Sequence, residues 1–333
     1  MSESHRPTLQ EHWAQLGKEP TSGPDHIRTS ELPIETSQGK LLAAVDHDGC
    51  RHLLVPLNAN QHVRRDRGST ALEMRERPLE TDDLYERYAD LGCLRKDLDP
   101  VFTGLCADVL EAAESDPGRP LKALYTVVDR WRALFLPSPT RLRDDQLTGL
   151  FGEMVVLNQL LLEESTAVDF WTGPSGHRHD FTVGRHDIEV KASITAKDRR
   201  IRIHGAEQLQ PPVHGTLDLV WLRLEQVSAG GRSLPELVNS ATQHGDDDNG
   251  LLFKLAQAGY SPADAHSYRN TRFAVLEHRW YEVDDTFPRI DPAAAPSGVS
   301  DVHYTVDLDK QSPAATETSG VATRIRQITQ ERE

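Results

Sequence analysis

Apolar residues recur with different spacings along the chain, and these spacings predict its elements. In residues 32–77, short apolar segments alternate with polar ones, and Asp48-Gly49 between two of them is a turn signal. This pattern predicts a small antiparallel sheet. Apolar residues three and four apart then predict two helices, over 99–115 and 120–135. We therefore expect an α+β region at the start of the chain.

The clearest helical pattern lies at residues 143–165. Glu153 lies at the flank of its apolar stripe, so it should reach the surface on which the helix packs. The stripe consists of Leu147, Leu150, Met154, Leu157 and Leu161. Four strand-like segments follow at 180–183, 186–193, 200–204 and 216–224, with a brief helix at 206–210. This order predicts an α/β fold in which helices flank a mixed sheet.

Composition shifts indicate how the chain is divided. The prolines of "LPSPT" predict a boundary near residue 138, which closes the α+β region at 1–138. A core domain at 139–235 follows, and then an α+β extension at 236–312. The polar tail at 313–333 is expected to be frayed.

Composition and charge exclude several classes of protein. The 333 residues carry a formal net charge of −15, which argues against a protein that coats nucleic acid by bulk electrostatics but leaves room for a local basic cleft. No apolar run approaches the roughly 18–20 residues that cross a bilayer, and the polar start has no apolar signal core. We therefore expect no membrane partner and a cytoplasmic location. The three cysteines form no C-x-x-C pair, which indicates reduced thiols.

The segment "HDFTVGRHDIEVK" is typical of a β-hairpin. Gly184-Arg185 suits a type II′ turn, because glycine at the first central position accepts a positive φ. The resulting register places Asp180 opposite Glu189 on one face, and the period of two places Lys191 on the same face. Of the eight lysines in the chain, only Lys191 has an acid two residues before it.

Two carboxylates that face each other on neighbouring strands repel, so a third group must offset the repulsion. A hard divalent cation does so, since Mg²⁺ takes one or two carboxylates together with waters and phosphate oxygens. A lysine beside such a metal can position or help to deprotonate a water for attack on phosphorus. The pattern thus indicates a site where Asp180 and Glu189 bind Mg²⁺, or Mn²⁺ in its place, beside Lys191. The alternative is that charged residues simply mark strand ends at a surface.

Five short motifs lie within residues 147–225, namely "GLFGEM", "WTGP", "HDF", "IEVKAS" and "IHGAEQL". Together they resemble the PD-(D/E)XK nuclease superfamily, in particular bacterial PD-(D/E)XK motif proteins that accompany restriction-modification or phage-defence genes. The resemblance implies a restriction-endonuclease-like core and Mg²⁺-dependent hydrolysis of DNA. It makes Asp180 and Glu189 metal ligands, Lys191 the catalytic lysine, and Glu153 a support of the metal, directly or through water. Histidine replaces the usual proline before Asp180, a substitution that the superfamily tolerates.

Three further residues are candidates for contact with DNA. Gln208 could meet the scissile region, as glutamines of related nucleases do, although an exposed helix glutamine is an equal alternative. Arg200 and Arg202 project from one strand face and could contact phosphates, or they could form a solvated face. The chain has no G-x-x-x-x-G-K-[ST] motif, so an ATP-driven step needs a partner, and methyltransferase, helicase or ATPase subunits of a defence system are candidate partners.

The combined expectation is a metal-dependent DNA endonuclease that acts in restriction or phage defence. One alternative is a non-catalytic DNA-binding or assembly subunit that keeps the fold. The intact set of two acids and a lysine favours the enzyme, but the acidic net charge, with no obvious basic platform, keeps this alternative open. Another alternative is a hydrolase of RNA or of a different phosphate ester. A zinc site is disfavoured, because no cysteine or fourth ligand accompanies His177, His179 and His186.

Overall fold

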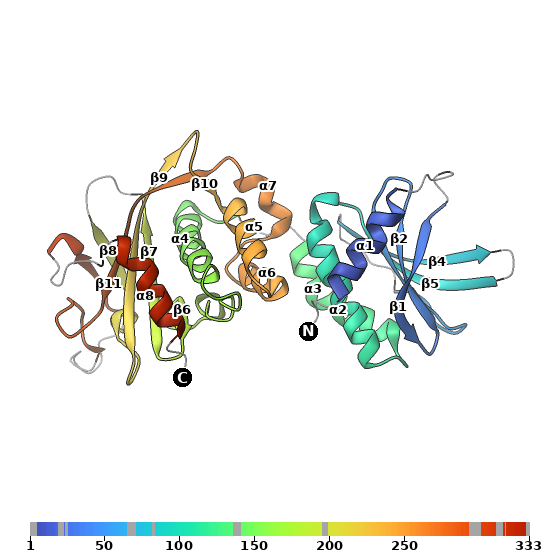
Figure 1. Cartoon of the computed structure of the whole chain (residues 1–333), viewed down its shortest axis with the longest axis horizontal. Coiled ribbons are helices and arrows are strands. Elements are labelled where there is room, and N and C mark those ends of the chain that lie inside the picture. The colour runs from blue at the N-terminus through green and yellow to red at the C-terminus, as the bar shows by residue number, and fades with distance from the viewer. Residues whose placement is uncertain are drawn as a thin grey trace. The chain divides into compact units, whose positions relative to one another are not determined.

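The computed structural model describes residues 5–18, 23, 26–64, 71–81, 84–135, 141–194, 199–292, 301–310, 316 and 318–330. The chain divides into two compact units, whose elements Figure 1 shows. Unit 1 comprises Met1–Pro139 with Ser261–Ala263, and unit 2 comprises Thr140–Tyr260 with Asp264–Glu333.

Unit 1 combines an antiparallel sheet with helices. Its helices are α1 (Arg6–Leu16), α2 (Asp99–Ser115) and α3 (Pro120–Phe135), and its strands are β1 (Arg28–Thr36), β2 (Gly39–Val45), β3 (Arg51–Pro56), β4 (Leu72–Thr81) and β5 (Leu84–Cys93). Within the described ranges these strands form one sheet in the order β1-β2-β3-β5-β4. The turn between β2 and β3 holds Gly49 at φ +78°, a conformation that glycine adopts readily. The two long helices therefore lie where the apolar spacing predicts them. The sheet is larger than predicted, because β5 lies beyond the expected range of 32–77.

Unit 2 combines a mixed sheet, a second small sheet and several helices. Its helices are α4 (Asp144–Leu161), α5 (Leu234–His244), α6 (Asp248–Gln257), α7 (Ala265–Tyr268) and α8 (Thr318–Gln330), and its strands are β6 (Phe181–Val183), β7 (His186–Ser193), β8 (Arg200–His204), β9 (Thr216–Val227), β10 (Arg232–Ser233), β11 (Arg272–Glu282) and β12 (His303–Asp307). For the residues described, the main sheet has the order β10-β11-β9-β7-β6, while β8 pairs only with β12. β7 and β9 run parallel and the other pairs run antiparallel. The expected α/β fold with a mixed sheet is confirmed.

The central strand β9 is buried on both faces and separates two apolar cores. Val220 and Leu222 belong to the core that α4 helps to build, whereas Leu219 and Trp221 belong to the core that β8 and β12 help to build. Successive side chains of a strand point to opposite faces of a sheet. α4 and the β8–β12 pair therefore cover opposite faces of the main sheet (Figure 1).

The C-terminal segment departs from the sequence-based expectation. The prediction of a frayed polar tail at 313–333 is wrong for Thr318–Gln330, which form α8. Val321, Ile325 and Ile328 are buried in the core next to α4. Their spacing of four and three residues places them on one helical stripe, and the polar residues between them mask that stripe in the average composition.

Two expectations from composition concern the cysteines and the membrane. Cys50, Cys93 and Cys106 are free and buried, as unreactive thiols should be. Burial raises the pKa of Cys93 to about 12. Over the residues that the structure describes, no helix has the length and apolar character to cross a bilayer.

Candidate functional site

The hairpin β6–β7 has the predicted register but ends one pair earlier than the pattern predicts. Val183 pairs with His186 and Phe181 pairs with Ile188, and the turn holds Gly184 at φ +60°. The ladder stops there, so the expected strand pairing of Asp180 with Glu189 does not form. The edge of β7 beyond Ile188 is consequently not covered by β6.

Asp180 covers this open edge with its side chain instead. Its Oδ2 accepts a hydrogen bond of 2.7 Å from the backbone N–H of Val190. Its carbonyl oxygen accepts hydrogen bonds from the N–H groups of Thr172 and Gly173, which turn its backbone away from β7. A Cβ on Gly173 would lie 3.0 Å from Asp180 Oδ1, so glycine in the "WTGP" motif allows the close approach. The carboxylate thus lies at the edge of β7 without belonging to the ladder.

Glu189 and Lys191 lie on the face of β7 that points away from α4. Their neighbours on β9 are Leu219 and Trp221, which face the β8–β12 pair. Lys191 Nζ lies 2.7 Å from Glu189 Oε1, and the side chains of Glu189 and Lys191 are 2% and 19% exposed. The predicted carboxylate and ammonium therefore form a nearly buried ion pair.

Glu153 approaches the same place from α4. Its neighbour Gly152 packs directly on the sheet, since a Cβ there would lie 2.8 Å from Cβ of Ala192. The Glu153 Oε2 accepts a hydrogen bond of 2.8 Å from Trp171 Nε1. Burial, and next the charge of Asp180, raise the pKa of Glu153 to about 8, against the opposing effects of Trp171 and Lys191.

The other two carboxyls are shifted in the same direction. Burial raises the pKa of Glu189 well above its ordinary value, and the negative charges of Asp180 and Glu153 add to this effect. Burial also raises the pKa of Asp180, although Lys191 and the Val190 N–H oppose the shift. Three carboxyls thus share one ammonium in a place where charge is poorly solvated. Carboxylate oxygens are the preferred ligands of a hard divalent cation, whose charge would offset their repulsion. In this structure the three carboxyls do not bring one oxygen each within 4.8 Å of one another, so the donor types fit such an ion but the side chains would have to move closer together to bind it.

Arg200 and Arg202 belong to β8, and Gln208 belongs to the short helix that follows this strand. Gln208 belongs to a short 3₁₀ helix, Ala206–Leu209, and its Oε1 accepts a hydrogen bond from the backbone N–H of His204. Arg200 and Arg202 are both exposed on one face of β8, as the alternation predicts. Arg200 Nε lies 3.8 Å from Asp307 Oδ2, whereas Arg202 lines a cavity.

Sequence reasoning missed two polar contacts around the site. Trp171 is fully buried, and its indole N–H donates a hydrogen bond to the Glu153 carboxylate. His179 Nδ1 lies 2.7 Å from Asp187 Oδ2, and both side chains are buried. The "WTGP" motif next to the hairpin was a signal for the first contact. The second contact depends on how the segment before β6 folds back, for which the sequence offers no signal.

A second cluster of possible metal ligands lies in unit 1. It consists of Asp46, His47 and Asp48, in the turn between β2 and β3, whose ligand atoms lie within 4.8 Å of one another. Among the described residues, this is the one group of three with ligand atoms so close together. Asp46 Oδ1 accepts a hydrogen bond from the Cys50 N–H, and its carbonyl oxygen accepts one from Gly49. The turn itself therefore accounts for the position of Asp46.

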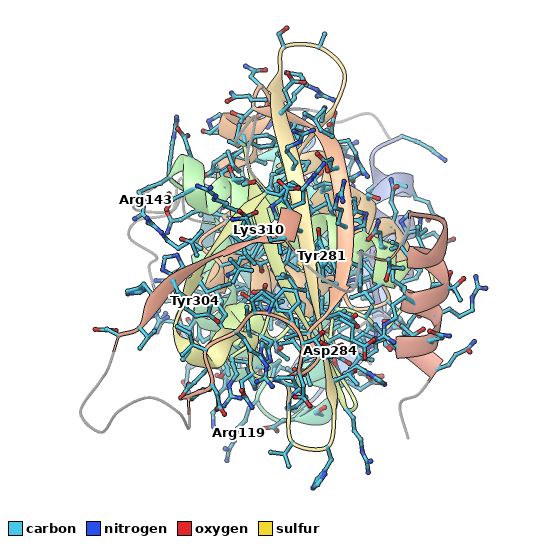
Figure 2. All side chains as sticks on the ribbon, turned by 90° about the vertical axis from the view of Figure 1, so that its left-hand side faces the viewer. Arg119, Arg143, Tyr281, Asp284, Tyr304 and Lys310 are labelled. Carbon is cyan, nitrogen blue, oxygen red and sulfur yellow. The ribbon has the colours of Figure 1, made fainter. Side chains whose placement is uncertain are left out.

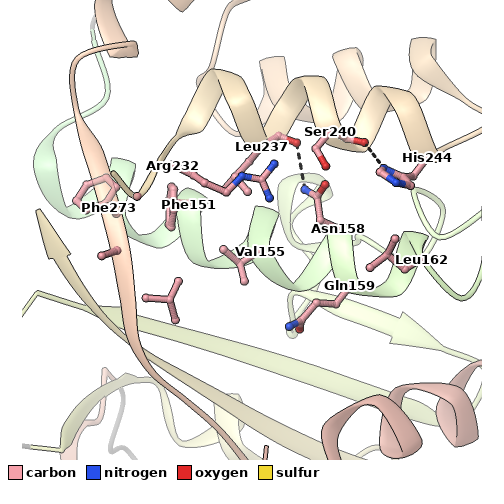
Figure 3. Close-up of a pocket in the computed structure, with 13 residues that line it drawn as sticks. Phe151, Val155, Asn158, Gln159, Leu162, Arg232, Leu237, Ser240, His244 and Phe273 are labelled. Carbon is pink, nitrogen blue, oxygen red and sulfur yellow. Dashed lines mark hydrogen bonds between the residues drawn. The ribbon is translucent and has the colours of Figure 1, made fainter. Parts of the chain in front are cut away.

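An apolar cavity of about 560 Å³ lies between α4, α5 and β11 (Figure 3). Phe151, Val155, Leu237 and Phe273 line it, with the polar Asn158 donating to the Leu237 carbonyl. Its described lining holds no carboxylate. Phosphate chemistry through a metal needs oxygen ligands, so this cavity is not part of the candidate centre.

Comparison with known proteins gives one match. A family model described as "Putative PD-(D/E)XK family member, (DUF4420)" matches residues 9–309. The matched range includes Glu153, Asp180, Glu189 and Lys191. Comparisons with curated proteins and with solved structures found no match.

Proposed function

Because the chain belongs to the PD-(D/E)XK family DUF4420, whose model spans residues 9–309, we propose that it is a metal-dependent nuclease that hydrolyses DNA phosphodiester bonds. The observation that carries the proposal is the buried pair of Lys191 Nζ and Glu189 Oε1, 2.7 Å apart, next to a second carboxylate at an open strand edge. A fold gains little from burying such groups, because the desolvation of buried ions offsets their attraction. Clustered carboxyls with raised pKa values are typical of functional sites.

The proposed roles follow from the positions of the side chains. Asp180 and Glu189 hold Mg²⁺, with Mn²⁺ able to replace it, and Glu153 supports the ion directly or through water. A bound divalent cation lowers the pKa of a coordinated water and offsets charge that develops on phosphate oxygens. Lys191, as an ammonium paired with Glu189, would orient the attacking water. To accept the proton of that water, it would first have to release a proton of its own and become a neutral amine. Trp171 keeps the Glu153 carboxylate turned toward the site.

The substrate and the setting are inferred from the motifs. The "IEVKAS" and "GLFGEM" segments support DNA as the substrate and a role in restriction or phage defence in the cytoplasm, with methyltransferase, helicase or ATPase subunits as candidate partners. Gln208, Arg200 and Arg202 are proposed to contact the DNA. The rival proposal is a DNA-binding or assembly subunit without activity, which the net charge of −15 keeps open.

Replacement of Lys191 tests the proposed reaction. We expect the wild-type protein with Mg²⁺ or Mn²⁺ to cut DNA, and Lys191→Ala and Lys191→Met to lower the rate by roughly 10²–10⁴, the usual contribution of a positioned acid–base group. Lys122→Ala, which removes a lysine from an exposed position of α3 in unit 1, should leave the rate unchanged. Circular dichroism and a thermal melt verify that each variant folds, and Lys191→Met keeps the apolar stem of the side chain.

Assays with several substrates distinguish a DNA nuclease from an RNA or nucleotide hydrolase and from a non-catalytic subunit. Duplex DNA, single-stranded DNA, RNA and nucleotides are each incubated with one metal at a time. Cleavage of RNA or of nucleotides alone would replace DNA as the substrate. DNA binding without cleavage in any metal would favour the non-catalytic subunit, and equal rates for Lys191→Met and wild type would remove Lys191 from the reaction.

A further inference from the structure

The outward face of the β8–β12 pair becomes more basic toward one end. In the register of the two strands, Arg200 lies opposite Asp307, Arg202 opposite Thr305 and His204 opposite His303. Arg200 is 3.8 Å from the carboxylate of Asp307. Among the ion pairs of the described residues, none involves Arg202, His204 or His303. One end of this face is thus electrically balanced, and the other carries uncompensated basic groups.

A cavity of about 400 Å³ lies at the basic end. Its lining consists of Arg202, His204, His303, Tyr304 and Thr305. The imidazole rings of His204 and His303 meet edge to face, with their centroids 5.2 Å apart. A neighbouring cavity of about 500 Å³ shares Tyr304 and Thr305 and extends past Arg289 to Lys310. Figure 2 shows Tyr304 and Lys310 along the β12 segment, in front of the main sheet.

The proposed catalytic lysine does not line this cavity, but its charge affects two residues that do. Lys191 is close enough to act electrostatically on both His204 and Tyr304. Partial burial, and then the positive charges of Lys191, His303 and Arg202, lower the pKa of His204. A cluster of cationic groups that hinder one another's protonation gains stability when an anion binds between them. The local positive charge contrasts with the net charge of −15 of the whole chain.

We propose that Arg202, His204 and His303 form a phosphate-binding subsite, which holds a backbone phosphate of the nucleic acid beside the bond to be cut. The inference rests on the proposed nuclease function and assigns that site its binding groups. The guanidinium of Arg202 donates to phosphate oxygens, and each imidazole adds a charged donor when it is protonated. The neighbouring cavity also contains Asp307, which lies 3.7 Å from Lys310, so the proposed subsite is confined to the first cavity.

The subsite has a defined pH dependence. The charged and titratable groups around His204 are Lys191 on β7, Arg202 on its own strand, and His303 and Tyr304 on β12. All of them are cationic or neutral near neutral pH, so protonation of His204 creates a stronger anion site without an internal carboxylate to compete. We expect nucleic-acid affinity to rise as pH falls below about 6.5, because the pKa of His204 is lowered from the ordinary value of histidine.

Binding measurements without cleavage test the subsite. Fluorescence anisotropy of a labelled oligonucleotide in EDTA compares the wild type with His204→Gln/His303→Gln and with Arg202→Gln. The matched control is His266→Gln/Arg269→Gln, which removes exposed basic residues elsewhere in unit 2. Each subsite variant should bind roughly tenfold more weakly at pH 6, because a hydrogen bond to a charged group contributes more than 1.4 kcal/mol. The slope of log affinity against log salt should fall by about one for Arg202→Gln.

The outcomes distinguish the subsite from the catalytic proposal. Affinities, salt slopes and pH profiles equal to those of wild type and control would overturn the subsite, even if the wild type cuts DNA. Weakened binding in these variants would support it even if no metal produced cleavage. If the wild type cleaves DNA, the subsite variants should have a higher KM and a nearly unchanged kcat. Binding of inorganic phosphate without binding of oligonucleotide would identify a free-anion site and overturn the assignment to nucleic acid. Melts of all variants confirm folding, and Arg202→Lys should keep most of the affinity.

Discussion

Glu189 holds an ionisable group at an almost completely buried position. Its side chain is 2% exposed and has one cationic neighbour, Lys191, while Asp180 and Glu153 repel it. Removing one partner of a buried ion pair leaves the other charge buried without a partner. This is strongly destabilising unless the remaining charge is neutralised. Glu189 therefore needs Lys191, a proton or a bound cation. This requirement links the stability of the site to its proposed chemistry.

A half-buried histidine away from the candidate site, His278, allows a pH prediction at the scale of one residue. His278 Nε2 accepts a hydrogen bond from Trp280 Nε1, and burial lowers the pKa of His278 to about 4. Above about 6.5 the histidine is neutral in both the folded and unfolded states, so its contribution to stability is complete. As pH falls from about 6.5 to about 4, only the unfolded state takes up the proton and the free energy of unfolding decreases, by at most about 3 kcal/mol.

Urea unfolding at several pH values measures this effect. His278→Gln should lose the decrease between pH 6.5 and 4, whereas the exposed His266→Gln should keep it. Identical pH profiles for wild type and His278→Gln would show that His278 does not titrate in this range.

At the scale of elements, the contact of α4 with β7 fixes the distance between the carboxylates. Gly152 brings the helix against Ala192 and Leu222, and the next residue is Glu153. Glu189 and Lys191 lie on the same strand as Ala192, on its other face. A change in the helix-to-sheet distance would therefore move Glu153 relative to the other acids.

Gly152→Ala and Gly149→Ala form a matched pair of tests on α4. A Cβ on Gly152 would lie 2.8 Å from Cβ of Ala192, so Gly152→Ala should destabilise the protein by about 1–3 kcal/mol through overpacking. A Cβ on Gly149 meets nothing within 4 Å, and Gly149→Ala should stabilise by up to about 1 kcal/mol through helix propensity. Urea unfolding measures both effects. Equal effects of the two substitutions would contradict the close packing of α4.

At the scale of the whole molecule, the two units predict separate responses to a metal. Each has its own sheet and core, and units of this size can unfold independently. The proposed ligands Asp180 and Glu189 belong to unit 2, whereas the cluster at Asp46 belongs to unit 1. A metal that binds only the folded state stabilises only the unit that binds it.

Calorimetry with and without Mn²⁺ tests this expectation. We expect two unfolding transitions, of which one shifts upward by the equivalent of about 2.7 kcal/mol at a hundredfold excess over Kd. Glu189→Gln should remove the shift, and Asp48→Asn should not. The shift should also weaken as pH falls below about 8, because Glu153 then holds a proton that competes with the metal. A shift that Asp48→Asn abolishes would place the metal in unit 1.

The sequence by itself determined several of the helices and strands and most of the acid-bearing hairpin. Apolar spacing predicts α2, α3, α4 and β9, because helix and strand periods depend on residues only a few positions apart. Gly184 and the alternation after it predict the turn, the register and the position of Lys191 on the face of Glu189. These features are local, so neighbouring residues suffice to specify them.

Only the tertiary structure decided which residues lie around the β6–β7 hairpin. Asp180 leaves the ladder because Thr172 and Gly173 bind its backbone, and Glu153 reaches the site because α4 packs closely on β7. The pairing of β8 with β12 brings His204 and His303 together across a long stretch of chain, and α8 buries three apolar residues in a segment of polar composition. Such contacts depend on the sum of many weak interactions between distant residues, which no local pattern records.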